Sequence, residues 1–222
     1  MAQIFRRSMN TIAKASIVAA VLLGGIAFYI STQIVRSSYF TGAYLDRQQP
    51  VQFSHKHHSG DDGIDCRYCH TSVETSSSAG MPPTQTCMNC HNQIWSDSPY
   101  LEVVRASYRD NKPIEWERVH DLPDYVYFNH SIHVAKGVGC TTCHGRMDEM
   151  PSVHQVSTLQ MEWCLSCHRE PEKFLRPKSE IYNQDYPGQN TTDEALALGQ
   201  QLKIDYKVRN RAFMQACSTC HR

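Results

Sequence analysis

The longest apolar stretch of the chain lies near its N-terminus. Residues 15–35 contain no charged side chain, and a helix needs about 20 apolar residues to cross a bilayer. A cleaved signal peptide has a shorter apolar region, of roughly 7–15 residues, before a small-x-small cleavage site. Phe28-Tyr29-Ile30 offers no such site. We therefore expect one transmembrane helix over residues 15–35 that stays on the mature chain.

The segments on either side of this stretch set its expected orientation. Residues 1–14 carry three basic and no acidic side chains, and such basic segments remain on the cytoplasmic side of a membrane. We predict a cytoplasmic N-terminus over residues 1–14 and a linker over residues 36–50. Residues 51–222 would then form one domain on the opposite side of the membrane.

Beyond residue 50 the apolar positions predict short helices. Apolar residues at helical spacing indicate helices over 99–109 and 192–205. Thr191 and Glu194 have the spacing of a capping box for the second of these helices. Another helix is expected to lead into the cysteine-containing segment that begins at Cys217.

Between these helices the sequence has the composition of loops. Residues 71–80 are small and polar, and residues 113–125 and 170–190 contain several prolines. No segment alternates apolar and polar positions over a length that would predict a sheet. The pattern therefore predicts a fold that is mostly α-helical and irregular, preceded by one transmembrane helix.

A cysteine motif recurs along this irregular domain. C-x-x-C-H occurs five times and uses all ten cysteines of the chain, and it is the attachment sequence of c-type haem. Its cysteines form two thioethers to the porphyrin, and its histidine is the proximal iron ligand. The expected thioether residues are Cys66, Cys69, Cys87, Cys90, Cys140, Cys143, Cys164, Cys167, Cys217 and Cys220. The expected proximal ligands are His70, His91, His144, His168 and His221.

Five copies with no cysteine left over argue against zinc or disulfide chemistry, and a thioredoxin-like redox motif would need a βαβ context. We therefore predict five haem c groups. Residues 51–222 provide roughly 34 residues for each haem, so much of the buried apolar surface must be porphyrin. Haem c is attached on the outer side of the bacterial inner membrane, which would place the haem domain in the periplasm. The balance of 22 basic and 22 acidic side chains gives no indication of nucleic-acid binding.

The motifs are arranged as a repeat. They begin at intervals of 21, 53, 24 and 53 residues, which indicates a duplicated two-haem unit. Each unit begins with the same pattern, V-x-F-x-H-x-x-H, at residues 51–58 and 126–133. Neutral imidazoles ahead of the attachment motifs suit the second axial position of iron. The repeat therefore predicts His55, His58, His130 and His133 as distal ligands.

The fifth haem must find its distal ligand outside the repeat, because the segment before Cys217 contains no histidine. His120 is narrowly favoured over a methionine, either Met150 or Met161. His154 and an open iron are the remaining alternatives. The choice matters, because histidine–methionine ligation raises the potential of a haem relative to bis-histidine ligation.

The F-x-H-x-x-H segments and their C-x-x-C-H sites resemble cytochromes c3 and c7. Three longer stretches are similar to the pentahaem subunit of bacterial alternative complex III. They are FSHKHHSGDDGIDCRYCH from Phe53, PPTQTCMNCH from Pro82 and VHDLPDYVYFNH from Val119. The resemblance implies a periplasmic haem subunit beside an iron–sulfur subunit and multispanning quinol-binding subunits. It implies that electrons from quinol pass to a monohaem cytochrome c or a terminal oxidase.

The leading hypothesis is therefore an electron-transfer subunit that is no enzyme on its own. One alternative is a multihaem reductase, or its electron donor, for a periplasmic acceptor such as nitrite, which would need an open iron. A small tetrahaem quinol dehydrogenase has a similar anchor but a different haem spacing. The anchor argues against a soluble storage cytochrome.

Overall fold

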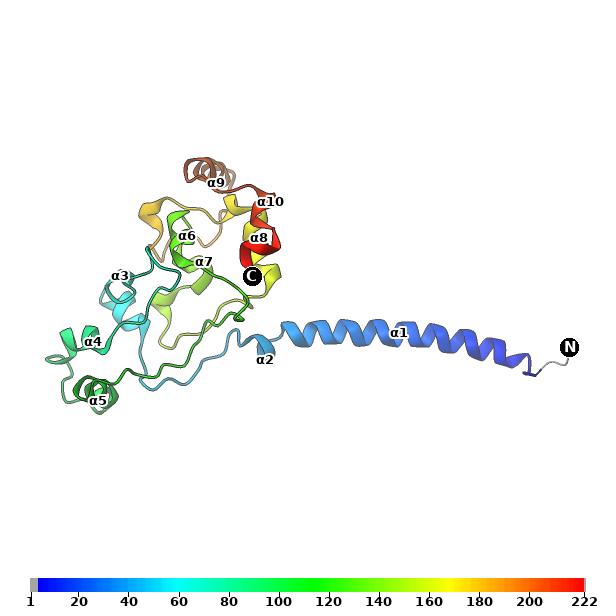
Figure 1. Ribbon diagram of the computed structural model, residues 1–222, viewed down its shortest axis with the longest axis horizontal. Coiled ribbons are helices and arrows are strands. Elements are labelled where there is room, and N and C mark those ends of the chain that lie inside the picture. Colours follow the sequence, from blue (N-terminus) through cyan, green and yellow to red (C-terminus); the bar gives the residue numbers. More distant parts are fainter. Residues whose placement is uncertain (1–3, 222) are drawn as a thin grey trace.

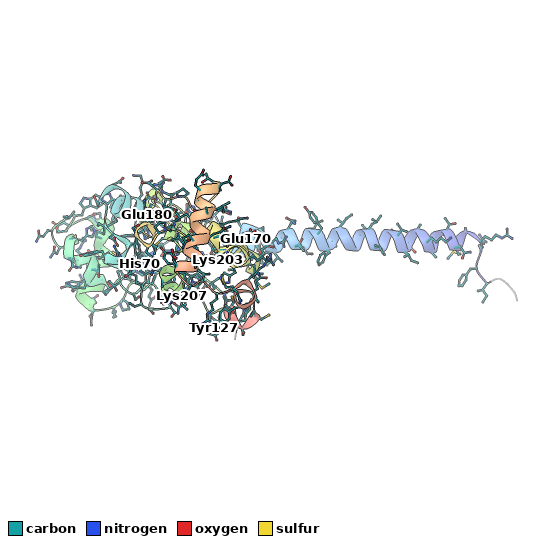
Figure 2. The ribbon with its side chains drawn as sticks, turned by 90° about the horizontal axis from the view of Figure 1, so that it is seen from above. His70, Tyr127, Glu170, Glu180, Lys203 and Lys207 are labelled. Atoms are coloured by element: carbon teal, nitrogen blue, oxygen red, sulfur yellow. The ribbon has the colours of Figure 1, made fainter. Side chains whose placement is uncertain are left out.

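The computed structural model describes residues 4–221 and consists of a long projecting helix and a compact helical domain (Figure 1). Helix α1, Ser8–Arg36, contains no buried residue, and its side chains point outward on every side (Figure 2). It is long and apolar enough to cross a membrane, a property that a membrane anchor and a signal sequence share. A short helix, α2 (Ser38–Thr41), connects it to the domain.

The domain is made of short helices joined by long irregular segments. Its α-helices are α3 (Cys66–Cys69), α4 (Thr84–His91), α5 (Glu102–Asp110), α6 (His130–Ala135), α7 (Cys140–His144), α8 (Met161–Arg169), α9 (Asp193–Asp205), α10 (Arg211–Met214) and α11 (Cys217–Cys220). A π-helical turn, η1 (Lys56–Asp61), and 3₁₀ turns, η2 (Pro99–Leu101), η3 (Met147–Glu149), η4 (Pro171–Lys173) and η5 (Lys178–Glu180), complete it. Within residues 4–221 the β-structure is limited to three isolated bridges. The predicted fold class is confirmed.

The three helices predicted beyond residue 50 are present: α5 and α9 differ slightly from the prediction at their ends, and the short α10 precedes the last motif. A 3₁₀ turn at Pro99–Leu101 precedes α5, so the first helix begins more tightly than a regular α-helix. The cap of α9 is Thr192, whereas the sequence suggested Thr191. Thr192 has extended backbone geometry, and its Oγ1 accepts a hydrogen bond from Ala195 N at 3.2 Å.

The polypeptide alone has a thin apolar core. Among the described residues the buried apolar side chains are Ala43, Val51, Val73, Val104, Met150, Leu175, Ile181 and Leu202. Large apolar side chains such as Tyr68, Trp95 and Phe213 are exposed instead. A domain of this size normally buries a far larger apolar surface, so the packing of the chain agrees with a core built largely from bound cofactor.

The C-terminal end of α1 is tied to the segment that leads into α8. Gln160 Nε2 donates to Val35 O at 2.9 Å, and Arg36 pairs with Glu162 at 2.8 Å. Tyr44 N donates to Gln155 O at 2.7 Å in the same region. The ion pair is half exposed and contributes little alone. These contacts fix which part of the domain lies next to the projecting helix.

Candidate haem-binding site

Four pairs of histidines face each other across the domain. The ring centres are 6.5 Å apart for His55 and His70, 6.1 Å for His58 and His91, 6.4 Å for His130 and His144, and 6.3 Å for His133 and His168. Two imidazoles bonded to one metal at roughly 2.0 Å have ring centres about 6 Å apart. Each pair therefore joins a predicted distal ligand to a predicted proximal ligand at the spacing of a bis-histidine iron.

A phenylalanine contacts the two predicted distal histidines of each repeat in the same way. Phe53 stacks on His58 at 4.4 Å and meets His55 edge-on at 4.8 Å. Phe128 stacks on His133 at 4.6 Å and meets His130 edge-on at 4.7 Å. The two F-x-H-x-x-H segments thus repeat in three dimensions, and each sends one imidazole toward each of two attachment motifs.

Backbone carbonyls orient most of these imidazoles. Nδ1 lies near a carbonyl oxygen in His58 (Ser54, 2.9 Å), His70 (Gly80, 2.8 Å), His91 (Ile94, 2.9 Å), His130 (Ser77, 2.8 Å), His133 (Asn129, 2.7 Å), His168 (Met214, 2.9 Å) and His221 (Tyr125, 3.4 Å). A carbonyl oxygen can only accept, so Nδ1 must carry the proton. Nε2 then has a free lone pair, which is the arrangement that an iron ligand needs.

The loop over residues 71–80 is part of this site, although its composition predicted a surface loop. Ser77 O accepts from both the backbone N and the ring Nδ1 of His130, at 3.1 and 2.8 Å. Ser76 O accepts from Ser131 N at 3.1 Å. The first repeat therefore orients a predicted ligand of the second. No sequence pattern marks such a role, because any residue provides a carbonyl.

Neighbouring attachment motifs bring their cysteines close together. The Cys66 and Cys140 thiols are within hydrogen-bond reach, which lowers the pKa of Cys66 and raises that of Cys140. Burial and then the nearby Cys87 thiol raise the pKa of Cys69. Burial and then Cys164 raise the pKa of Cys143 to about 11. The motifs therefore form a continuous row in space, in the order second, first, third and fourth.

The fifth motif extends this row. Burial and then the Cys220 thiol raise the pKa of Cys164, so the fourth and fifth motifs are neighbours. In Figure 1 the same order is visible from α4 through α3 and α7 to α8 and the C-terminal end. Helix α4 lies away from the junction with α1, and α8 lies beside it.

The residues present fit haem c. All ten cysteines lie in the five motifs as free thiols, available for thioether bonds. Within residues 4–221 no group of three or more His, Cys, Asp or Glu side chains is arranged to hold a bare metal ion. Paired imidazoles suit an iron whose other four ligands come from a porphyrin, whereas structural zinc needs four protein ligands. Burial lowers the pKa of His144 to about 3, which keeps this imidazole in its neutral, ligating form.

The candidates for the fifth distal ligand lie in different places. The ring of His120 is 4.4 Å from that of His144, at the third motif. Met150 is buried near Gly145, which follows the same motif. Met161 is 63% exposed at the first turn of α8, one turn before Cys164. Met161 begins the helix whose Cys164 thiol lies near Cys220 of the fifth motif, and Tyr125, five residues after His120, contacts His221 of that motif.

Two other histidines lie at the surface. His57, which has no counterpart in the second repeat, has a 58% exposed side chain near Asp61 and Asp62. His154 lies 3.3 Å from Asp46 on the segment that contacts the linker. Neither faces a proximal histidine at the spacing of the four pairs.

Comparisons with known proteins agree with this geometry. The model of the family described as cytochrome c7 and related cytochrome c matches residues 51–101 and 126–222. The multihaem cytochrome c subunit of menaquinone reductase from Nitratidesulfovibrio vulgaris (strain Hildenborough) is 36% identical over 102 residues. That alignment covers 46% of this chain and 48% of the relative, so the chain spans about half of the relative's length.

The family match covers both repeats and all five attachment motifs, which is well over half of the chain. It leaves out residues 1–50, with α1, and the segment between the two repeats. Together with the four histidine pairs, it shows that the protein belongs to the family of cytochrome c7 and related c-type cytochromes.

Proposed function

We propose that the chain is the electron-relay subunit of a membrane-bound quinol-oxidising respiratory complex. The observation that carries this proposal is the unbroken row of five attachment motifs, four of them with a facing histidine. Haem c, when bound, exchanges single electrons between its ferric and ferrous states. The residues of the chain would hold the iron ligands in place, and the four facing histidines leave little room for a substrate on iron.

The position of α1 supports a relay that starts or ends at the membrane surface. The contacts of Val35 and Arg36 with Gln160 and Glu162 put α8, and with it the fourth and fifth motifs, at the base of the helix. The second motif lies at the other end of the row. We expect α1 to remain as a single-pass anchor in the bacterial inner membrane, with the domain in the periplasm.

The partners follow from the resemblance and from the relative. The relative is a subunit of a menaquinone reductase, which supports a connection to quinone chemistry. We propose that this chain works as the pentahaem subunit of an alternative complex III. It would receive electrons from an iron–sulfur subunit and multispanning quinol-binding subunits and pass them to a monohaem cytochrome c or a terminal oxidase. One helix provides no enclosed quinol pocket, so the isolated chain should not be an enzyme.

The proposal is tested by measuring quinol oxidation in two preparations. When the chain is purified from its native membrane, iron–sulfur and multispanning subunits should co-purify with it. This assembly should reduce an added cytochrome c with electrons from a quinol analogue. The isolated, fully haem-loaded chain should show no such turnover. Comparable turnover by the isolated chain would contradict the proposal, and rapid nitrite reduction by it would favour the reductase hypothesis.

We infer that Met161 provides the distal ligand of the fifth haem. His120, the narrow favourite from sequence, lies against His144, whose iron position is already shared with His130. Met150 is buried beside the same third motif. Met161 has an exposed thioether on the helix that adjoins the fifth motif, and it lies on the same face of α8 as Cys164, three residues on.

This assignment predicts a visible signature. The wild-type spectrum should contain a sulfur-to-iron charge-transfer band from one haem in five. Met161→His should remove the band and lower the potential of that haem, because bis-histidine ligation stabilises ferric iron. Met81→Leu, at a methionine that is 62% exposed, is the matched control and should keep the band. A wild-type protein with no such band would contradict the assignment.

A further inference from the structure

Arg176 is a fully buried cation that forms no ion pair with the described carboxylates. Its relative exposure is 0%, and no carboxylate among the described residues lies within ion-pair distance of it. Its guanidinium donates instead to neutral oxygens of Thr141, Thr142, Pro187, Glu180 and Asn183. Buried charges in proteins are normally paired, because removing a charge from water is costly. A charge kept in this setting calls for a specific role.

The guanidinium lies directly against the third attachment motif. Its Nη2 donates to Thr141 Oγ1 at 2.9 Å and to Thr142 Oγ1 at 3.3 Å, and these are the two residues between Cys140 and Cys143. A Cβ atom at Gly139 would collide with the same group, so glycine there allows the close approach. Arg176 N also donates to Gly137 O at 2.9 Å.

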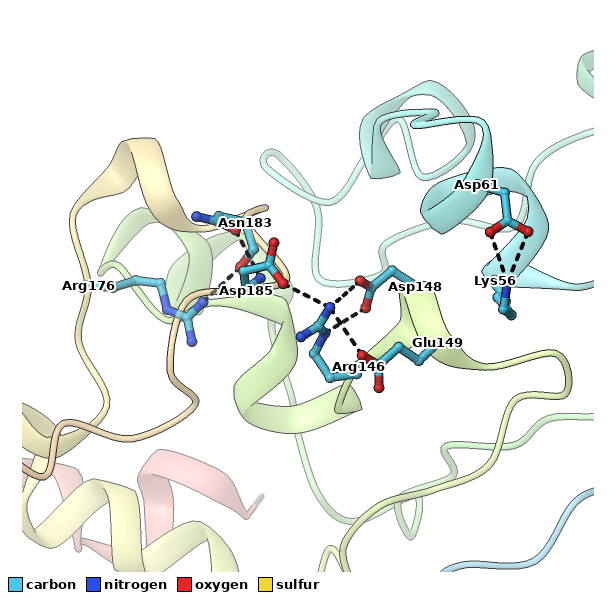
Figure 3. Close-up of polar contacts among 8 residues, drawn as sticks. All are labelled: Lys56, Asp61, Arg146, Asp148, Glu149, Arg176, Asn183 and Asp185. Atoms are coloured by element: carbon cyan, nitrogen blue, oxygen red, sulfur yellow. Dashed lines mark hydrogen bonds and ion pairs between the residues drawn. The ribbon is translucent and has the colours of Figure 1, made fainter.

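Arg146 provides a contrast only a short distance away, as Figure 3 shows. It also lies next to the third motif, two residues after His144. Its side chain is 39% exposed and pairs with Asp148 at 2.6 Å, Asp185 at 2.9 Å and Glu149 at 3.3 Å. Solvent and three carboxylates screen this charge. Arg176, on the other side of the 183–185 turn, is buried, and the Glu180 carboxylate acts on it only from beyond ion-pair distance.

We propose that Arg176 raises the reduction potential of the haem held at the third motif. Reduction of a ferric haem adds one electron, so a fixed positive charge nearby stabilises the product more than the reactant. The interaction is strong where the local dielectric constant is low and no counter-ion is paired with the cation. Net charge and burial are among the means by which a protein sets a haem potential. Because α7 lies in the middle of the row, this residue would set the potential of the central carrier.

The inference rests on the proposed binding of haem at the third motif, so haem content is measured first, by the pyridine haemochrome assay. The five midpoint potentials are then determined by spectroelectrochemical titration of the holoprotein without quinol or a partner. Arg176→Gln and Arg176→Met, both neutral, should shift one of the five potentials downward. Arg176→Lys keeps the positive charge but replaces the planar guanidinium group with an ammonium group. It should leave that potential close to the wild-type value.

Arg146→Gln is the matched control, because it changes the net charge by the same amount beside the same motif. It should produce a clearly smaller shift than Arg176→Gln. The proposal would be overturned by equal shifts in Arg176→Gln and Arg146→Gln, or by unchanged potentials in the neutral Arg176 variants. It would also be overturned if Arg176→Lys lowered the potential as much as the neutral variants do. Failure of both neutral variants to take up five haems would assign Arg176 to assembly and would overturn it as well. Quinol turnover is not part of the measurement, so failure of the proposed relay would be seen separately.

Discussion

Replacement of Cys140 and Cys143 by alanine should abolish assembly of the haem domain. These residues lie in the middle of the row, where Cys66 contacts Cys140 and Cys164 is close to Cys143. The apolar core of the polypeptide is too thin to hold the domain together without the central porphyrin. The variant should therefore contain far fewer than four haems per chain and be degraded. Haem per chain and the yield of folded protein are the measurements.

The same substitution at the fifth motif is the control. Cys217 is exposed, and only the fourth motif adjoins it within the row. Cys217→Ala together with Cys220→Ala should cost one haem and leave four, with the remaining spectra unchanged. Four haems in both double variants would show that the central position gives no structural advantage.

His58→Ala should convert one haem from low spin to high spin. His58 faces His91 at 6.1 Å, and Phe53 together with Ser54 O fixes its ring. Alanine offers no ligand, and no other imidazole in the described chain faces His91 at this spacing, so the second iron should become five-coordinate. Electron paramagnetic resonance should show a new high-spin signal from one haem in five, together with a displaced potential.

His57→Ala changes the neighbouring residue and is the stringent control. Its side chain faces solvent near Asp61 and Asp62, and the corresponding residue of the second repeat is Ile132. All five haems should keep their spin state and potentials. A high-spin signal in His57→Ala with none in His58→Ala would refute the pairing of His58 with His91.

The repeat made much of the site predictable. The V-x-F-x-H-x-x-H pattern nominated four distal histidines from sequence, and the structure brings each of them opposite one proximal histidine. The alternating motif intervals also indicated which motifs form units. Periodic patterns are informative in this way because one local geometry is used twice.

Features that depend on the backbone or on distant contacts could not be predicted. The carbonyl of Ser77 orients His130 across 53 residues of sequence, and a carbonyl has no side-chain signature. Arg176 lies in a segment described from sequence as a proline-containing loop, yet among residues 4–221 it is the largest fully buried side chain. The N-cap of α9 is Thr192, one residue after the Thr191 that the sequence suggested. Two neighbouring threonines cannot be distinguished as N-caps until the backbone angles are known.

The position of the distal histidines along the chain bears on the biogenesis of the protein. His55 and His58 precede both motifs whose irons they would complete, and His130 and His133 precede theirs. In the proposed export through the membrane, each predicted ligand segment would therefore emerge first and have no iron to bind until haem is attached downstream. We expect maturation to proceed in two cooperative blocks, each closing only after its second haem is attached, and chains stalled between the motifs of one block to be substrates for periplasmic proteases.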